Sequence, residues 1–273
     1  MRDTFLIVDG NSLMHRAFHA LPLMDYNGVY TNAVHGFLSM LLRCIRERAP
    51  RYCAVAFDEH APTFRHTEYA EYKAGRAPTP DELRPQFDII KEILSAMGLG
   101  VLSLTGYEAD DILGTLSSQC AQRDIAALLL TGDRDALQLV SDDTTLLLTR
   151  KGISEIEECT PARVQELFGV RPDQITDLKG LMGDSSDNIP GIPGVGEKTA
   201  VKLLTSYDTL ENVLAHADEI KGKLGEKVRG NAEKGRFSKH LATIRRDIPL
   251  QVHYDACETQ HLADGLPVLY KYG

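Results

Sequence analysis

The chain has 273 residues, of which 43% are hydrophobic and 25% are charged, and its formal net charge is −9. A chain of this length supports one large domain or two smaller ones. No apolar run is long enough to span a membrane, and the first residues lead into an apolar strand rather than a signal peptide. The five cysteines are scattered without a C-x-x-C pair, which argues against a disulfide framework or a structural zinc site and favours a cytoplasmic protein.

The charge is unevenly distributed along the chain. Between Glu197 and Arg246 there are eleven Lys and Arg residues against seven Asp and Glu, a net charge of +4. The rest of the chain is therefore more acidic than the total suggests. An acidic half beside a basic half fits a metal site next to a surface that follows a phosphate backbone. Ordinary solvated helices would explain the same charges taken alone.

Four short runs of continuous apolar residues, at 4–8, 53–57, 126–130 and 145–149, predict strands buried on both faces. Helical patterns at 35–48, 87–97 and 108–122 separate these runs. The alternation predicts an α/β fold with a central, mostly parallel sheet flanked by helices. Asp9, Asp58 and Asp133 follow the first three strands. In such sheets, ligands bind beyond the carboxyl ends of the strands.

A polar segment over residues 64–85 interrupts this pattern, because it has too few aliphatic residues to bury a face. Thr79 and Glu82 have capping-box spacing around Pro80, and Pro85 is expected to break or kink that helix after about one turn. We predict a mobile, partly helical excursion above the sheet. It carries Arg65, Tyr69, Tyr72, Lys73 and Arg76.

Beyond residue 160 the pattern changes to short helices, which are expected to begin at Pro161 and Pro172 and to end at Gly169 and Gly183. Further helices are predicted at 197–204 and 209–216, followed by a Lys-rich pair. These features predict an α/β domain over residues 1–160 and a helical domain over residues 161–273. Residues 257–273 show no strong pattern, and we expect the chain to continue into a longer protein.

Acidic residues recur where the predicted elements meet. Glu108, Asp110 and Asp111 lie at a predicted helix start, where the helix dipole alone would favour acids. Further acids lie at strand ends or in the turn that begins at Gly183: Asp9, Asp58, Asp133, Asp135, Asp184 and Asp187. Two like charges about 4 Å apart repel by roughly 4 kcal/mol at an effective dielectric near 20, so a gathering of these acids requires cations.

Oxygen ligands without His or Cys favour Mg²⁺ or Mn²⁺. The number of carboxylates indicates two ions, and two such ions clamp the attacking and leaving oxygens in phosphodiester cleavage. Other motifs fit less well. Glu197 interrupts a Walker A pattern, Asn11 replaces the second acid of an aspartyl-phosphate phosphatase, and His15 and His19 lack the glutamate of H-E-x-x-H.

Six motifs follow one another along the chain: Val-Asp-Gly-Asn at 8–11, Phe-Asp at 57–58, Tyr-Lys-Ala-Gly-Arg at 72–76, Gly-Tyr-Glu-Ala-Asp-Asp at 106–111, Thr-Gly-Asp-Arg-Asp at 131–135 and Gly-Asp-Ser-Ser-Asp-Asn-Ile-Pro-Gly at 183–191. Together they resemble the 5′-nuclease domain of bacterial DNA polymerase I, in the wider flap endonuclease family, over about residues 4–250. The resemblance implies a PIN-like or resolvase-like metal domain, a helical arch over about residues 64–85, and a helix–three-turn–helix DNA-binding motif over about residues 183–204.

The resemblance also implies roles for individual residues. The first metal ion would be held by Asp9, Asp58, Glu108 and Asp110, and the second by Asp133, Asp135, Asp184 and Asp187. Asp111 would be either a further acid of the metal site or a residue behind the metal ligands. Lys73 and Arg76 would contact the scissile phosphate, and Tyr72 would stack on a base. Arg65, Lys179, Lys198 and Lys202 would contact DNA. Gly191, Gly194 and Gly196 would keep the hairpin backbone accessible to DNA and to a K⁺ ion.

The function implied is a 5′-3′ exonuclease and flap endonuclease with two Mg²⁺ ions, for which Mn²⁺ would substitute. Its substrates would be 5′-flap, nicked or branched duplex DNA and RNA primers on DNA, in replication and repair. The expected protein is monomeric, cytoplasmic, associated with the nucleoid rather than a membrane, and fused to a polymerase. Three alternatives remain: a stand-alone 5′-nuclease, a PIN-type ribonuclease, which lacks the hairpin and arch, and a non-catalytic module that binds DNA structures.

Overall fold

The computed structural model describes residues 2–272. Its central sheet contains six strands, in the spatial order β5 (Gly100–Leu102), β4 (Tyr52–Ala56), β1 (Thr4–Asp9), β6 (Ala126–Thr131), β7 (Thr144–Thr149) and β8 (Ile156–Cys159). All neighbouring strands pair in parallel except β7 and β8, which are antiparallel. A separate two-stranded hairpin consists of β2 (Asp25–Tyr26) and β3 (Val29–Tyr30).

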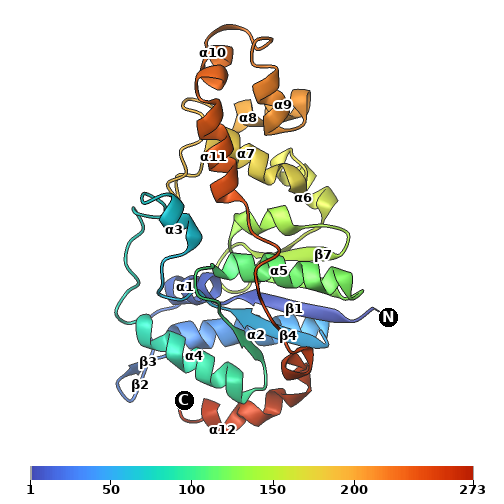
Figure 1. The fold of residues 1–273 in the computed structure, drawn as a ribbon. Coiled ribbons are helices and arrows are strands. Elements are labelled where there is room, and N and C mark those ends of the chain that lie inside the picture. The colour runs from blue at the N-terminus through green and yellow to red at the C-terminus, as the bar shows by residue number, and fades with distance from the viewer. Residues whose placement is uncertain (1, 273) are drawn as a thin grey trace.

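Helices cover both faces of this sheet (Figure 1). One face carries α1 (Gly10–Ala20), α2 (Asn32–Arg48) and α4 (Arg84–Ala96), and the other carries α5 (Ala109–Gln122). Side chains on β1 alternate between two apolar cores, so that Leu6 and Val8 pack with α1, α2 and α4, while Phe5 and Ile7 pack with α5. The fold class predicted from the apolar runs is therefore confirmed.

A helical unit follows β8 and stands on the α5 side of the sheet (Figure 1). It contains α6 (Pro161–Phe168), the 3-10 turn η2 (Pro172–Gln174), α7 (Ile175–Met182), α8 (Glu197–Tyr207), α9 (Leu210–Ala215), α10 (Gly222–Gly230) and α11 (Ala232–Ala242). Its buried residues, such as Leu181 and Leu204, join the same apolar cluster as Ile112 and Leu116 of α5. The helical unit thus packs against the sheet domain through a shared apolar core and is not joined to it by linkers alone.

The polar excursion differs from the prediction in one respect. It contains one short helix, α3 (Phe64–Glu68), and then turns without further helix until α4 begins at Arg84. Pro85 does not break a helix, because it lies in the first turn of α4, where a missing backbone N–H leaves no hydrogen bond unmade. We call residues 69–83 the arch segment.

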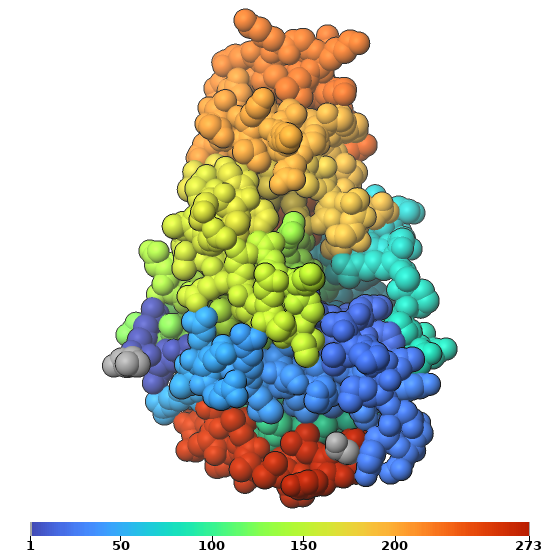
Figure 2. Space-filling model, turned by 180° about the vertical axis from the view of Figure 1, so that it is seen from behind, coloured from blue at the N-terminus to red at the C-terminus, as the bar shows by residue number. Residues whose placement is uncertain are grey.

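The chain after α11 returns to the sheet domain. It runs along α5, where Ile248 N donates to Thr115 Oγ1 at 3.2 Å and Gln119 Nε2 donates to Leu250 O at 3.1 Å. The remaining elements are η3 (Tyr254–Cys257), η4 (Thr259–Gly265) and α12 (Leu266–Leu269). Figure 2 shows this tail in red at the end of the molecule opposite the helical unit.

The domain division at residue 160 stays a prediction, but residues 244–272 do not lie with the helical unit as expected. A further 3-10 segment, η1 (Arg134–Leu139), joins β6 to β7. Within residues 2–272, no helix has both the length and the apolar character that a membrane crossing requires.

Candidate active site

Two adjoining cavities open where the parallel strands end, and acidic side chains line both. The first has a volume of about 260 Å³ and is lined by the carboxylates of Asp9, Asp58, Glu108, Asp110 and Asp133. The second has a volume of about 520 Å³ and is lined by Asp133, Asp135 and Asp184. Seven of the nine acids expected at a metal site therefore meet at one edge of the sheet. Asp133 belongs to both cavities and joins them.

Strand ends and helix starts hold the acids of the first cavity. Asp9 ends β1 and caps α1, with Ser12 N donating to its Oδ1 at 2.9 Å and Thr131 Oγ1 donating to its Oδ2 at 2.7 Å. Asp58 follows β4, and its Oδ1 accepts a hydrogen bond from Ala109 N at the start of α5 at 2.7 Å. Glu108 and Asp110 come from that same helix start. The carboxylates are thus fixed by backbone geometry rather than by flexible loops.

The electrostatics of the first cavity call for a cation. Burial raises the pKa of Asp9 to about 7, with repulsion from Asp58 and Asp133 adding to the shift. Burial and repulsion from Asp133 and Asp9 also raise the pKa of Asp110 well above its ordinary value. The Oδ1 atom of Asp110 is buried and has no hydrogen-bond partner. Crowded carboxylates with an unpartnered oxygen fit a hard divalent cation.

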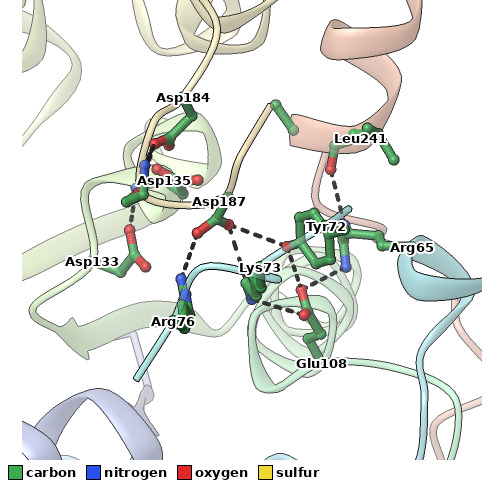
Figure 3. A network of polar contacts seen from close by, with 12 residues as sticks. Arg65, Tyr72, Lys73, Arg76, Glu108, Asp133, Asp135, Asp184, Asp187 and Leu241 are labelled. Carbon is green, nitrogen blue, oxygen red and sulfur yellow. Dashed lines mark hydrogen bonds and ion pairs between the residues drawn. The ribbon is translucent and has the colours of Figure 1, made fainter. Parts of the chain in front are cut away.

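The protein's own cations hold several of these acids (Figure 3). Lys73 Nζ lies 2.7 Å from Glu108 Oε1, Arg76 pairs with Asp187, and Lys179 pairs with both Asp135 and Asp184. Among residues 2–272, no three carboxyl, imidazole or thiol groups stand close enough together to hold a metal as they are. Glu108, Asp187, Asp135 and Asp184 are each paired with one of these ammonium or guanidinium groups instead.

Lys179 shifts its two partners differently. At Asp184 burial raises the pKa, but Lys179 and the hydrogen bonds from Ser186 outweigh it and lower the pKa to about 2. At Asp135 burial and the nearby Asp133 outweigh Lys179 and raise the pKa to about 7. The Lys179 side chain is 13% exposed and lines the second cavity rather than the outer surface, and its contact with the DNA backbone stays a prediction.

Three further expectations are corrected by burial. Arg65 is not on a DNA-facing surface, because its side chain is only 3% exposed and pairs with Asp111 and Glu108. Asp111 is fully buried in that ion pair and lines neither cavity. Tyr72 is buried with its hydroxyl 3.0 Å from Glu108 Oε2 and 3.2 Å from Asp187 Oδ2, so its ring is covered rather than free to stack on a base.

Lys73 and Arg76 line the first cavity. Asp187 was expected at the second metal ion, but it lines neither cavity, and its carboxylate pairs with Arg76. Lys198 and Lys202 are exposed on α8, and Gly196 precedes that helix. Their roles stay predictions.

The hairpin between α7 and α8 depends on glycine. Gly191 has a φ of +60°, and a Cβ atom placed there would lie 2.2 Å from Gly183 N, so only glycine fits. Gly194 also has a positive φ, of +80°, and is exposed. Asp184 sits at the base of this turn, where backbone bonds with Ile189 at 2.8 Å in both directions fix it.

Sequence reasoning missed Ser12, which lines both cavities and accepts a hydrogen bond from Gly132 N at 2.9 Å. It also left undecided the roles of Asn11 and His15, both of which line the first cavity. The available signal was position, because polar residues in the first turns of a helix that follows a buried strand point toward the carboxyl edge of the sheet.

Two family descriptions match consecutive parts of the chain. Residues 4–169 match the 5′-3′ exonuclease N-terminal resolvase-like domain, and residues 170–264 match the 5′-3′ exonuclease C-terminal SAM fold. The chain belongs to the 5′-3′ exonuclease family. The resemblance stated from the six motifs is thereby confirmed, and so is the class of enzyme that it implied.

Relatives agree with this assignment. The chain is 50% identical to DNA polymerase I of Bacillus caldotenax over 257 residues, and 48% identical to DNA polymerase I of Bacillus subtilis over 261 residues. These matches cover 93% and 95% of this chain but only 29% and 30% of the relatives, so the chain corresponds to the nuclease part alone.

Solved structures share the fold. A zinc-bound T5 5′-exonuclease has a TM-score of 0.73 at 21% identity, covering 98% of each chain. A flap endonuclease of bacteriophage T5, in a pseudo-enzyme-product complex with DNA and metal ions, has a TM-score of 0.72 at 20% identity, again covering 98% of each chain.

Proposed function

We propose that this chain is a divalent-metal-dependent 5′-3′ exonuclease and flap endonuclease. It hydrolyses phosphodiesters in flapped, nicked or branched duplex DNA and leaves a 5′-phosphate and a 3′-hydroxyl. In the cell it removes RNA primers and displaced 5′ strands during replication and repair, as part of a polymerase. Family membership and the names of the polymerase relatives support this proposal.

The observation that carries the proposal is the buried, unpartnered oxygen of Asp110 in a cavity shared with Asp9, Asp58 and Asp133. Carboxylates gathered in this way need a proton or a cation to neutralise their charge, and a divalent cation can do so at neutral pH. We assign the first metal ion to Asp9, Asp58, Glu108 and Asp110. The second is assigned to Asp133, Asp135 and Asp184, with Asp187 beside them.

Two Mg²⁺ ions held there, or Mn²⁺ in their place, would lower the pKa of the attacking water and stabilise the leaving oxygen. The chain's own residues do the rest. Lys73 and Arg76, at the wall of the first cavity, reach the scissile phosphate and stabilise the charge that grows on it. To do so they must leave Glu108 and Asp187, their partners in the structure.

DNA binding is assigned to the helical unit. Lys198 and Lys202 are four residues apart on α8 and therefore share a face that meets the phosphate backbone. The hairpin backbone at Gly194 and Gly196 is exposed and is our candidate for contact with DNA and with a K⁺ ion. Gly191 shapes this hairpin from inside, because it is buried and its N–H donates to Ser238 Oγ at 2.9 Å. The T5 structures with metal ions and with DNA support metal and DNA binding by this fold. We place the protein with the bacterial chromosome in the cytoplasm, as a monomer.

A 5′-flap duplex tests the proposal directly. We expect cleavage at the flap junction with Mg²⁺ or Mn²⁺, no cleavage in EDTA, and no cleavage by Asp110→Ala or Asp184→Ala although both still bind the duplex. A single-stranded RNA of the same sequence is the control substrate, since a PIN-type ribonuclease would cut it. Binding without cleavage in any metal would instead indicate a non-catalytic DNA-binding module.

A further inference from the structure

Arg65 uses every N–H group of its guanidinium inside the protein. Nε donates to Leu241 O at 2.9 Å, and Nη2 donates to Thr243 O at 2.9 Å and to Asp111 Oδ1 at 2.8 Å. Nη1 donates to Asp111 Oδ2 at 2.8 Å and to Glu108 Oε2 at 3.0 Å. These are all five donors that an arginine has. A side chain so fully bonded is fixed in one position.

The two oxygens of Glu108 are held differently. Oε2 accepts from Arg65 Nη1 and from the Tyr72 hydroxyl at 3.0 Å, both of which are buried. Oε1 is held by Lys73 Nζ, at 2.7 Å, on the arch segment. Glu108 lines the first cavity. Arg65 therefore restrains Oε2 of Glu108. Oε1 is left as the oxygen whose partner can change, from Lys73 to a metal ion.

Asp111 holds both Arg65 and the backbone of Glu108 in place. Besides its two bonds with Arg65, its Oδ2 accepts a hydrogen bond from Glu108 N at 3.1 Å, so it fixes both the guanidinium and the backbone of Glu108. Its Oδ1 also accepts from Arg245 N at 2.9 Å. Because Leu241 and Thr243 lie at the end of α11, which packs on α7, the same guanidinium ties the helical unit to the start of α5.

We propose that Arg65, locked by Asp111, is a positioning residue that presents Glu108 Oε1 to a divalent cation in the first cavity. The inference rests on the metal dependence proposed above. It needs the planar fork of arginine, because a lysine ammonium donates in three directions and cannot bridge Asp111 and Glu108 in the same geometry. Residues behind a metal ligand typically change metal affinity about 10- to 100-fold when they are replaced.

The test measures Mn²⁺ binding to the whole chain without DNA. The readout is the electron paramagnetic resonance signal of the Mn²⁺ that stays free. Arg65→Lys, Arg65→Gln and Asp111→Asn are compared in an Asp184→Ala background, which isolates the first cavity. We expect each variant to bind Mn²⁺ about tenfold or more weakly. In the otherwise unaltered chain, flap cleavage should fall at low Mg²⁺ and recover at high Mg²⁺, while duplex affinity in EDTA stays unchanged.

A matched control is Asp177→Asn. Asp177 is buried in the helical unit, where it accepts from Lys239 Nζ at 2.6 Å and from Leu210 N at 2.9 Å, so its loss breaks an ion pair of a buried aspartate away from both cavities. Its Mn²⁺ affinity should match that of the parent chain. Should Arg65→Gln fail to fold, Arg65→Lys and Asp111→Asn decide the matter, since both keep the size of the side chain.

Folded variants at both positions with parental Mn²⁺ affinity would overturn the positioning role. The variants could bind Mn²⁺ more weakly than the parent while the parent itself cleaves no flap. That result would refute the proposed function and leave the positioning role of Arg65 standing.

Discussion

At the scale of single residues, some acids of the site have hydrogen-bond and ion-pair partners in the fold, and one has a buried oxygen without a partner. Asp111 has the Arg65 guanidinium and two backbone N–H donors around it, whereas Asp110, one position earlier, has a buried oxygen without a partner. Two adjacent acids in one helical turn can therefore have opposite surroundings, because successive helical residues point about 100° apart. The unstabilised acid is the one that faces the cavity.

Asp110→Asn should stabilise the metal-free protein at neutral pH while it abolishes cleavage. The pKa of Asp110 is raised in the folded state, because burial and the neighbouring carboxylates penalise its charge. That penalty is fully present above the folded-state pKa and shrinks as the pH falls from there toward the lower, unfolded-state pKa, where the carboxyl is protonated in both states. We expect a melting temperature a few degrees above the parent at pH 8 and little difference at pH 4. A lower melting temperature at pH 8 would contradict this account.

Sequence patterns located the acids of the cavities but not the partners of the buried charges. Asp9, Asp58 and Asp133 are marked by the strand that precedes each of them. Nothing local reveals that Arg65 pairs with an acid 46 residues away, or that Lys179 turns inward to Asp135. Burial of a long cationic side chain depends on which acids the tertiary fold places beside it, and the sequence of its own helix does not contain that information.

At the scale of elements, two carboxylates, Asp187 and Glu108, hold the arch segment against the first cavity. Asp187, in the hairpin loop, accepts hydrogen bonds from the Tyr72 hydroxyl and from Arg76, and its backbone carbonyl accepts one from Lys73 N at 3.0 Å. Lys73 has a φ of +55°, an uncommon conformation for a non-glycine residue. The contacts to Asp187 offset that strain and fix the arch segment against the cavity.

Tyr72→Phe should loosen the arch segment without unfolding the protein. The substitution removes the hydroxyl that joins Glu108 to Asp187, and losing such bonds to charged groups costs about 1.5 to 3 kcal/mol. We expect faster tryptic cleavage after Lys73 and Arg76, measured by mass spectrometry under native conditions. Tyr69→Phe is the control, because no hydrogen bond of its hydroxyl is seen within residues 2–272. Equal cleavage rates in both variants would remove the hydroxyl from the closure.

Replacing Lys198 and Lys202 together by Ala should weaken duplex binding at every sequence alike. Each phosphate contact contributes about 0.9 to the slope of log affinity against log salt concentration, so the slope should fall by about 2. Arg46→Ala, on α2 beneath the sheet, is the control and should leave the slope unchanged. Binding isotherms at several salt concentrations measure this, and an unaltered slope in the double variant would move the DNA path elsewhere.

The predicted strands were right where hydrophobicity is continuous, and strands without such a run were missed. The runs at β1, β4, β6 and β7 are buried on both faces and are visible in the sequence. The strand β8 reads Ile-Glu-Glu-Cys and lies at the antiparallel edge, so its two consecutive glutamates conceal it. The strand β5 has only three residues, too few for any periodic pattern.

At the scale of the whole molecule, the tail after α11 fastens the helical unit and the sheet domain together. The ring of Tyr254 packs edge-on against Phe5 at 5.3 Å and Tyr52 at 5.6 Å, with Arg123 above it at 4.2 Å. Residues 254–265 carry no periodic pattern, because 3-10 turns bury side chains at irregular intervals. Their docking could not be predicted from sequence for that reason.

Tyr254→Ala should destabilise the fold without altering the chemistry. Removing a buried aromatic side chain typically costs about 3 to 5 kcal/mol, because a cavity remains. We expect a lower urea midpoint and an unchanged rate of flap cleavage at 25 °C. Tyr270→Ala is the matched control, since that ring is 79% exposed. A Tyr254→Ala protein as stable as the control would show that the tail is not a structural tie.

Because the tail returns to the sheet domain, the last described residues are a suitable place to attach a label or a tether. The last described residues lie at the end of the molecule opposite α10 (Figure 1), and none of them lines either acidic cavity. A fluorophore, an affinity handle or a surface tether attached there stands clear of both openings. Single-molecule measurements on an immobilised chain can therefore follow substrate capture and release without the anchor shielding the mouth of either cavity.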